Sequence, residues 1–252
     1  MIEARRASKH YGDIAVIDNI SLRIPAGGLT TIIGHNGAGK SSLLGMVSRL
    51  APASSGTVTV DGVDVSRTPS DVLARRLAIL KQDNQTVTRL TVRELVAFGR
   101  YPYSKGQLTK ADRTHIDAAM ANLELEPLAD RLMDELSGGQ RQRAYIAMVL
   151  CQDTEYVLLD EPINSLDIHH SVAVMKLLKG MAKNLGKTIV LVLHDINFAS
   201  CYSDHIVAMH KGRVAAQGTP LDIIRTDLLQ ELYGQDVTVH EINGQRIGVY
   251  YR

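Results

Sequence analysis

Alternating hydrophobic and polar residues predict short β-strands over roughly residues 1–66, including SLRI at 21–24 and LTTII at 29–33. The apolar segment SSLLGMVSRL predicts a helix shortly after the second of these strands. The segment TVTVDGVDV at 57–65 predicts a hairpin, because Asp61-Gly62 can adopt the positive φ angles of a two-residue turn. The first part of the chain is therefore expected to be rich in β structure.

A helical pattern replaces the strands over roughly residues 85–150. Thr91 is followed three residues later by Glu94, and Thr109 by Asp112, and both pairs predict capped helix starts.

Strands return in the last part of the chain as continuous apolar runs, YVLLD at 156–160 and TIVLVLHD at 188–195, which are typical of buried parallel strands. The segment 171–185 fits a crossover helix between them, and Asn243-Gly244 predicts a second hairpin. This order of elements predicts an α/β core interrupted by a helical insertion.

Composition places the chain among ordinary soluble globular proteins, with 252 residues, 45% hydrophobic and 22% charged. The net charge of +1 and the absence of Trp give no support to a nucleic-acid-binding surface. Cys151 and Cys201 form no metal-binding pattern and are expected to be reduced thiols. The N-terminus lacks the apolar core of a signal peptide, and the apolar runs are far shorter than the ~20 residues that cross a bilayer.

The segment GHNGAGKSS at 34–42 follows an apolar strand, precedes a helix and matches the phosphate-binding pattern GxxxxGK[ST]. Its glycines allow successive backbone N–H groups to turn toward phosphate, and the helix N-terminus adds partial positive charge. We expect Lys40 to reach the β- and γ-phosphates and the Ser41 hydroxyl to hold Mg²⁺. A chance glycine-rich turn would lack this strand–loop–helix context.

Two acidic residues, Asp160 and Glu161, end the apolar run at 156–160. The carboxyl ends of parallel strands are where ligands bind in open α/β sheets. We expect Asp160 to bind Mg²⁺ through water, and Glu161 to orient or deprotonate the attacking water. His194 ends the next apolar run, where we expect its imidazole to contact the γ-phosphate.

A second pair of glycines opens a helix at LSGGQ, residues 136–140, with no strand before it. Ser137 is a good N-cap, and Gly138 and Gly139 leave backbone N–H groups accessible at the positive end of the helix dipole. These residues predict a second anion site, separate from the phosphate loop.

In combination, these motifs make the chain similar to the ATP-binding cassette ATPases, in which LSGGQ is the signature sequence. The resemblance covers nearly the whole chain. It implies that each ATP lies between the phosphate loop of one copy and the glycine pair of a second copy, so a homodimer with two shared sites is expected.

The same resemblance implies the fold class: an α/β P-loop NTPase core with a mixed, mainly parallel sheet, an antiparallel β subdomain and a helical insertion subdomain. A single ATPase domain is expected over residues 1–252. Within it, the core with the antiparallel β subdomain is expected over about 1–84 and 151–235, the helical insertion over about 85–150 and a C-terminal hairpin over about 236–252.

Individual site residues also follow from the resemblance. Tyr11 matches the aromatic residue that stacks on adenine, and Gln82 matches the glutamine that contacts Mg²⁺ and the water. Asp167 belongs to the loop that crosses the dimer interface, and His194 matches the switch histidine. The expected catalytic residues are Glu161, His194 and Gln82; those expected to hold Mg²⁺ are Ser41, Gln82 and Asp160; and those expected to bind ATP are Tyr11, Gly34, His35, Asn36, Gly37, Ala38, Gly39, Lys40, Ser41, Ser42, Ser137, Gly138, Gly139, Gln140 and Asp167. The family more often has other residues at His35, Ser42 and Ile163, but these differences remove no catalytic group.

The chain resembles the separate ATPase subunit of an importer. The segment RELVAFGRYPYSKG at 93–106 is similar to cassettes that serve iron–siderophore, haem and cobalamin importers. This resemblance implies a peripheral protein on the cytoplasmic face of the inner membrane, with integral membrane permease subunits and, indirectly, a substrate-binding protein as partners. A ferric siderophore is the expected substrate, and haem, cobalamin or a metal ion are the alternatives.

A soluble cassette protein that acts on nucleic acid or the ribosome is a further alternative. Such proteins usually carry a coiled-coil insertion or two cassettes, and the sequence shows neither, so no nucleic-acid partner is expected. A non-hydrolysing nucleotide-binding regulator would be expected to lack Glu161 or the signature sequence. His169 and His170 are not expected to share a metal ion, because adjacent helical residues point about 100° apart.

Overall fold

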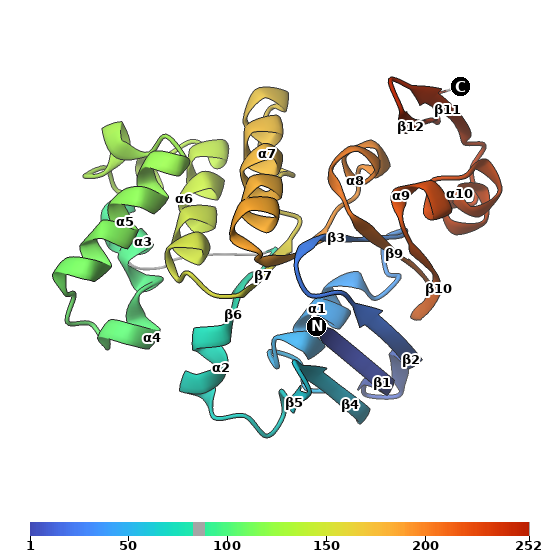
Figure 1. Cartoon of the computed structure of the whole chain (residues 1–252), viewed down its shortest axis with the longest axis horizontal. Helices are drawn as coiled ribbons and strands as arrows, with labels where there is room; N and C mark the ends of the chain where they lie inside the picture. The colour runs from blue at the N-terminus through green and yellow to red at the C-terminus, as the bar shows by residue number, and fades with distance from the viewer. Residues whose placement is uncertain (83–88, 252) are drawn as a thin grey trace. The chain divides into compact units, whose positions relative to one another are not determined.

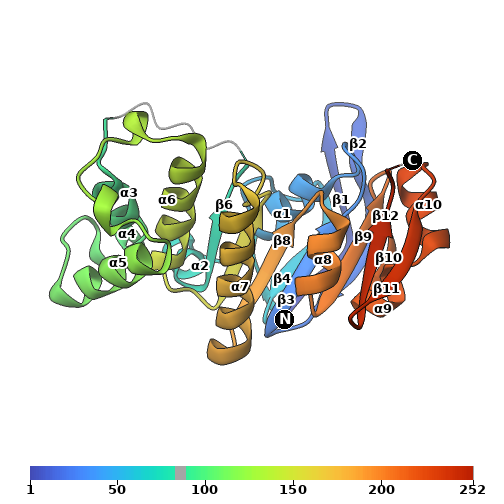
Figure 2. The same cartoon turned by 90° about the horizontal axis from the view of Figure 1, so that it is seen from above.

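The computed structural model describes residues 1–82 and 89–251, and the chain divides into two compact units. Met1–Thr68 and Lys179–Arg252 form the first unit, and Pro69–Leu178 form the second. Figures 1 and 2 show the ribbon from two directions. The division into core, insertion and C-terminal hairpin stays a prediction, and residues 83–88 and 252 of that division lie outside the described residues.

An antiparallel sheet in the first unit has the strand order β2–β1–β4–β5. Its strands are β1 (Ile2–Tyr11), β2 (Ile14–Ile24), β4 (Ser55–Val60) and β5 (Val63–Asp64). Asp61 and Gly62 have φ angles of 50° and 76°, so the predicted hairpin turn is confirmed.

Three parallel strands in the same unit carry the phosphate loop. Strand β3 (Gly28–Ile33) lies between β8 (Thr188–Val192) and β9 (His205–His210), and β10 (Arg213–Gly218) adds to β9 in the antiparallel direction. Every residue of β8 and all but the first of β3 are buried, as expected for parallel strands. Strand β8 ends at Val192, so the prediction of a strand to residue 195 was three residues too long, and His194 lies beyond the strand.

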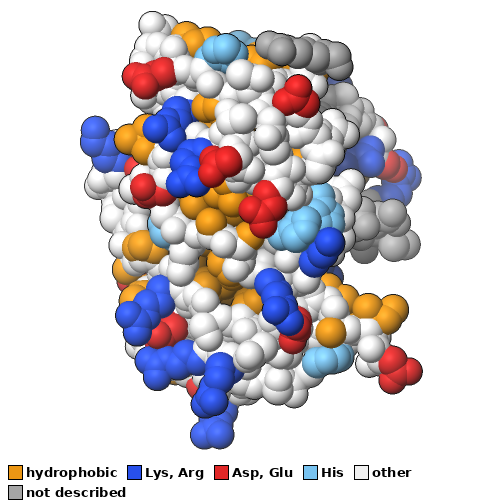
Figure 3. Space-filling model, turned by 90° about the vertical axis from the view of Figure 1, so that its right-hand side faces the viewer, with side chains coloured by type: hydrophobic (Ala, Val, Ile, Leu, Met, Phe, Trp, Pro, Cys, Tyr) orange, Lys and Arg blue, Asp and Glu red, His pale blue; other side chains and the backbone are white. Residues whose placement is uncertain are grey.

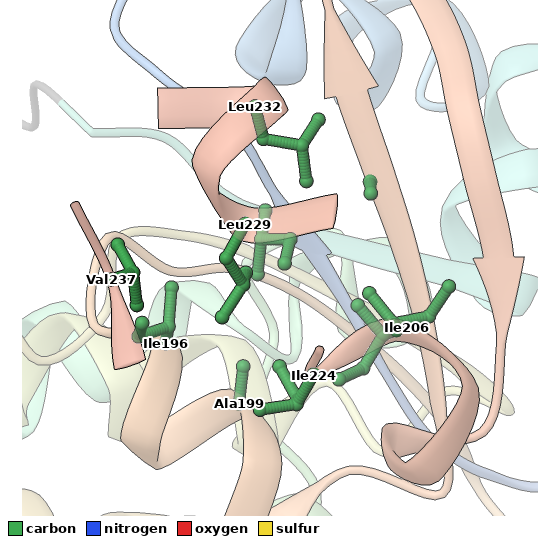
Figure 4. Close-up of a cluster of buried hydrophobic side chains, with 10 residues drawn as sticks. Ile196, Ala199, Ile206, Ile224, Leu229, Leu232 and Val237 are labelled. Carbon is green, nitrogen blue, oxygen red and sulfur yellow. The ribbon is translucent and has the colours of Figure 1, made fainter. Parts of the chain in front are cut away.

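Four helices and a hairpin complete the first unit: α1 (Lys40–Val47), α8 (Ile196–Tyr202), α9 (Pro220–Ile223), α10 (Thr226–Tyr233), β11 (Thr238–Ile242) and β12 (Gln245–Val249). Asn243 and Gly244 have φ angles of 51° and 74°, which confirms the second predicted turn. Figure 4 shows hydrophobic side chains of α8, β9, α9 and α10 packed into one cluster. This cluster fixes α8 relative to the C-terminal segment.

Charges of both signs are mixed on the side of the molecule shown in Figure 3, where Lys and Arg side chains stand among Asp and Glu side chains, with small hydrophobic groups between them. Among the described residues, no helix combines the length and the apolar character needed to cross a membrane.

The second unit contains a parallel strand pair and most of the helices. Strand β6 (Leu77–Leu80) pairs with β7 (Tyr156–Asp160), which confirms a parallel strand at 156–160. The helices are α2 (Ser70–Arg76), α3 (Val92–Phe98), α4 (Tyr101–Ser104), α5 (Lys110–Asn122), α6 (Gly138–Cys151) and α7 (Ile168–Leu185), with single 3₁₀ turns η1 (Glu126–Leu128) and η2 (Met133–Glu135).

Both predicted capping pairs are present: Thr91 with Glu94 starts α3, and Thr109 with Asp112 starts α5. The crossover helix α7 starts three residues earlier than predicted and runs across the boundary between the units.

A buried ion pair ties three helices of the second unit together. Arg100 Nε donates to Asp112 Oδ1 at 2.9 Å, and Arg100 Nη1 donates to the carbonyl of Cys151, at the end of α6, at 3.0 Å. The other oxygen of Asp112 accepts from the hydroxyl and the backbone N–H of Thr109. These donors, with Thr109 first and Arg100 next, lower the pKa of Asp112 to about 2.

We predict that Asp112→Asn lowers the thermal midpoint of unfolding by several degrees at about pH 6, because Arg100 then loses its buried anion. A depressed pKa stabilises the fold above the pKa of the unfolded chain, about 4, and that stabilisation is lost as the pH falls toward about 2. The difference between wild type and variant should therefore shrink between about pH 6 and about pH 3.

Asp117→Asn is the matched control, since Asp117 lies on the same helix but forms an exposed ion pair with Arg93. It should change the midpoint little at either pH, because solvent screens exposed pairs. If the thermal midpoints of wild type and Asp112→Asn differed by the same amount at both pH values, the role given to the carboxylate of Asp112 would be contradicted.

Candidate functional site

The phosphate loop, residues 34–42, connects β3 to α1 in the first unit and fits closely against neighbouring strands. Gly34 has a φ of 145°, and a Cβ atom there would lie 2.2 Å from the carbonyl oxygen of Met209 on β9. Gly39 has a φ of 96°, and a Cβ atom there would lie 2.6 Å from Ile17 Cδ1 on β2. Both positions therefore require glycine.

Lys40, the first residue of α1, is only 5% exposed and turns back toward the loop. Its Nζ donates to the carbonyl oxygens of Gly34, at 2.8 Å, and His35, at 3.0 Å. Ala38 and Gly39 are buried as well, whereas Asn36 and Gly37 at the tip of the loop and Ser41 are exposed; His35 and Ser42 are half-buried.

Strand register brings His194 to the same end of the parallel sheet as the phosphate loop. Ile32 on β3 pairs with Val192 on the parallel strand β8. Gly34 lies two residues after Ile32 and His194 lies two residues after Val192, so both leave the sheet at the same level. The exposed His194 lines a cavity of about 280 Å³. Tyr11 lies elsewhere in this unit, at the end of β1, where its ring is 52% exposed and the ammonium of Lys9 lies 4.9 Å from the ring centroid.

Two buried acidic residues, Asp160 and Glu161, end β7 in the second unit. Gln82 follows β6, the parallel neighbour of β7, and its Nε2 donates to Glu161 Oε2 at 2.8 Å. Asn164 Nδ2 donates to the same oxygen. The sequence did not single out Asn164; its place three residues after Glu161, in the turn of DEPIN, was the available signal.

The signature helix α6 begins with a complete capping box. Ser137 Oγ accepts from the backbone N–H of Gln140, and the side-chain oxygen of Gln140 accepts from the backbone N–H of Ser137. Ser137 and Gly138 are exposed, and no atom lies within 4 Å of the place where a Cβ of Gly138 would stand. The glycine pair therefore presents an open backbone surface at the positive end of the helix dipole.

Within the second unit, the signature helix contacts the loop that follows Glu161. Gln142 Nε2 donates to the carbonyl of Pro162 at 3.0 Å, and a Cβ of Gly139 would lie 3.4 Å from the carbonyl oxygen of Ser165. Gln142 is a second residue that the sequence did not single out. The structure thus brings the signature and the predicted catalytic carboxylate into one connected part of the unit.

The carboxylate of Asp167 caps helix α7, because Oδ1 accepts from the backbone N–H of His170 at 2.8 Å and from its ring Nδ1 at 2.9 Å. These bonds from His170, backbone first, lower the pKa of Asp167. One ligand atom each from Asp167, His169 and His170 lies within 4.8 Å of the others. The N-cap accounts for the contact of Asp167 with His170, and the expectation that His169 and His170 do not share a metal ion stays a prediction.

Comparisons with known proteins agree with this arrangement. A family model described as ABC transporter matches residues 17–164. The chain is 51% identical to the petrobactin import ATP-binding protein YclP of Bacillus subtilis (strain 168), over 100% of both chains. It is 43% identical to the ferric enterobactin transport ATP-binding protein FepC of Escherichia coli (strain K12), over 89% of this chain and 83% of the relative.

Among solved structures, the fold is similar to the dimeric ATP-binding cassette MJ0796 bound to ADP and phosphate, with a TM-score of 0.79 and 28% identity. That match covers 87% of this chain and 99% of the cassette. The chain therefore belongs to the ABC transporter family and is an ATP-binding ATPase of that family.

Proposed function

We propose that this ATPase drives the uptake of a ferric siderophore through a separate membrane permease. The observation that carries this proposal is a full-length match: the relative that is 51% identical over 100% of both chains is named for petrobactin import. A second relative, FatE of Bacillus anthracis, has the same named substrate and is 51% identical over 92% of this chain. Haem, cobalamin or a metal ion are the alternative substrates.

Each copy would contribute its phosphate loop to one ATP and its signature glycines to another. In support, Gly138 is exposed and Gly139 is half-buried at the N-terminus of α6, which suits an anion from outside the unit. The cassette MJ0796, which resembles this chain, is a dimer in its solved structure. Tyr11 would stack on adenine, Asp167 would lie at the dimer interface, and the remaining contacts with ATP would come from residues 34–42 and 137–140.

Ser41, Gln82 and Asp160 offer hydroxyl, amide and carboxylate oxygens, the donor types that Mg²⁺ prefers. Bound there, the ion would neutralise charge on the phosphates. Glu161 would orient and deprotonate the attacking water, with Gln82 and Asn164 holding its carboxylate. His194 would contact the γ-phosphate.

The partners of such an importer would be a second copy of this chain, integral permease subunits and, indirectly, a substrate-binding protein. The ATPase would then lie on the cytoplasmic face of the membrane. In the second unit, the described segment 93–106 includes the exposed aromatic residues Phe98 and Tyr101, which suit contact with permease loops.

We predict that Glu161→Gln binds ATP but hydrolyses it about 10²- to 10³-fold more slowly, because the amide cannot accept the proton of water. ATP turnover and the proportion of dimer at saturating ATP are the measurements. Glu155→Gln makes the same change at an exposed position just before β7 and should keep wild-type turnover. Wild-type turnover by Glu161→Gln would contradict the proposed role.

Ser137→Arg should abolish ATP hydrolysis and leave nucleotide binding by the phosphate loop measurable, because the bulky cation fills the start of α6. A fluorescent ATP analogue reports the binding. Thr114→Arg, which adds the same charge at an exposed position of α5, is the control and should retain hydrolysis. Loss of both binding and hydrolysis in Ser137→Arg would indicate misfolding, whereas wild-type hydrolysis by this variant would contradict the two-copy site.

The substrate can be tested in cells that lack this protein and are complemented with wild type or Glu161→Gln. Uptake of iron from ferric petrobactin should be restored only by wild type. Parallel assays with labelled haem and labelled cobalamin distinguish the alternatives. Restoration of haem or cobalamin uptake without ferric petrobactin uptake would overturn the siderophore assignment.

A further inference from the structure

The side chain of Asn197 on helix α8 binds the backbone of the C-terminal hairpin. Asn197 Oδ1 accepts from the backbone N–H of Gly248 at 2.8 Å, and Asn197 Nδ2 donates to the carbonyl of Gly248 at 3.2 Å. The side-chain amide of Asn197 thus pairs with both backbone groups of one residue of β12, much as a neighbouring strand would.

The packing at this point is tight, so that a larger residue would have to displace a neighbouring side chain. Gly248 is buried, and a Cβ atom there would lie 2.6 Å from Ile196 Cδ1. One turn further along α8, Ser200 Oγ donates to the carbonyl of Arg246 at 2.6 Å. Figure 4 shows Ile196 beside Val237, in the segment that leads into the hairpin.

An N-cap residue also fixes the first turn of α8. Asp195 is the N-cap, and its Oδ1 accepts from the backbone N–H groups of Asn197, at 2.7 Å, and Phe198, at 3.1 Å. His194 immediately precedes this cap. Its backbone is therefore set by a turn that the hairpin holds in place.

The same C-terminal segment lines the cavity beside His194. Ile196, Tyr233, Val237 and Tyr250 line it together with His194, and Tyr250 directly follows β12. His194 thus lies in the wall of a cavity whose other lining residues belong to α8 and the C-terminal segment.

We propose that the C-terminal hairpin positions His194 for ATP hydrolysis and that Asn197 is the positioning residue. This inference rests on the γ-phosphate contact proposed for His194. A displacement of about 1 Å in a group that contacts the reacting phosphate can lower the rate by up to about 10²-fold. Nucleotide binding depends on the phosphate loop and not on this contact.

The test compares Asn197→Ala with Ser200→Ala in the purified full-length chain. Both variants remove hydrogen bonds between α8 and β12, but only Asn197 lies in the turn that follows His194. Asn197→Ala should lower kcat about tenfold and leave the KM for ATP within about twofold. Ser200→Ala should lower the thermal midpoint to a similar degree and keep kcat within about twofold.

Gly248→Ala disturbs the same contact from the hairpin side, because its added methyl group must displace Ile196. This variant should also lower kcat and leave the KM for ATP nearly unchanged. In a His194→Ala background, Asn197→Ala should cause no further loss of kcat, because a positioning residue acts through the residue that it positions. Equal kcat values for Asn197→Ala, Ser200→Ala and wild type, with a strongly reduced kcat in His194→Ala, would overturn this inference alone. Wild-type kcat in His194→Ala would overturn both the inference and the proposed role of His194.

Discussion

The carbonyl oxygen of Met209 occupies the space where a Cβ atom of Gly34 would lie, and this close contact fixes the phosphate loop to the parallel sheet. Strand β9, which carries Met209, pairs with β3, so the loop starts from a rigid support. Lys40 then turns back and bonds to the carbonyls of Gly34 and His35. The fold therefore organises the backbone that is proposed to bind phosphate.

Much of this architecture could be predicted because its signals are local. Asp61-Gly62, Asn243-Gly244 and the capping boxes specify backbone geometry within four residues, and all of them form. The exact end of β8 and the partners of Glu161 could not be predicted in the same way. Asn164 is marked only by its place in DEPIN, three residues after Glu161. Gln142 and Asn197 act through hydrogen bonds whose partners are set by tertiary packing, and no short sequence pattern marks them.

The second unit joins two chemical features that the sequence separates. Gln142 on the signature helix donates to Pro162, the residue after Glu161, so the glycine pair and the proposed base share a connected framework. Movement of α6 would consequently shift the turn that carries the carboxylate of Glu161. This connection gives a physical route by which contact at the signature glycines can influence hydrolysis.

Glu161 has a φ of 52°, a left-handed conformation that glycine and asparagine adopt more readily than glutamate. Holding a residue there costs of order 1–3 kcal/mol, and the buried bonds from Gln82 and Asn164 help to maintain it. Neither glycine nor asparagine could take a proton from water. Glutamate at this position therefore lowers local stability. A search for stabilising substitutions would replace Glu161 and remove the proposed general base.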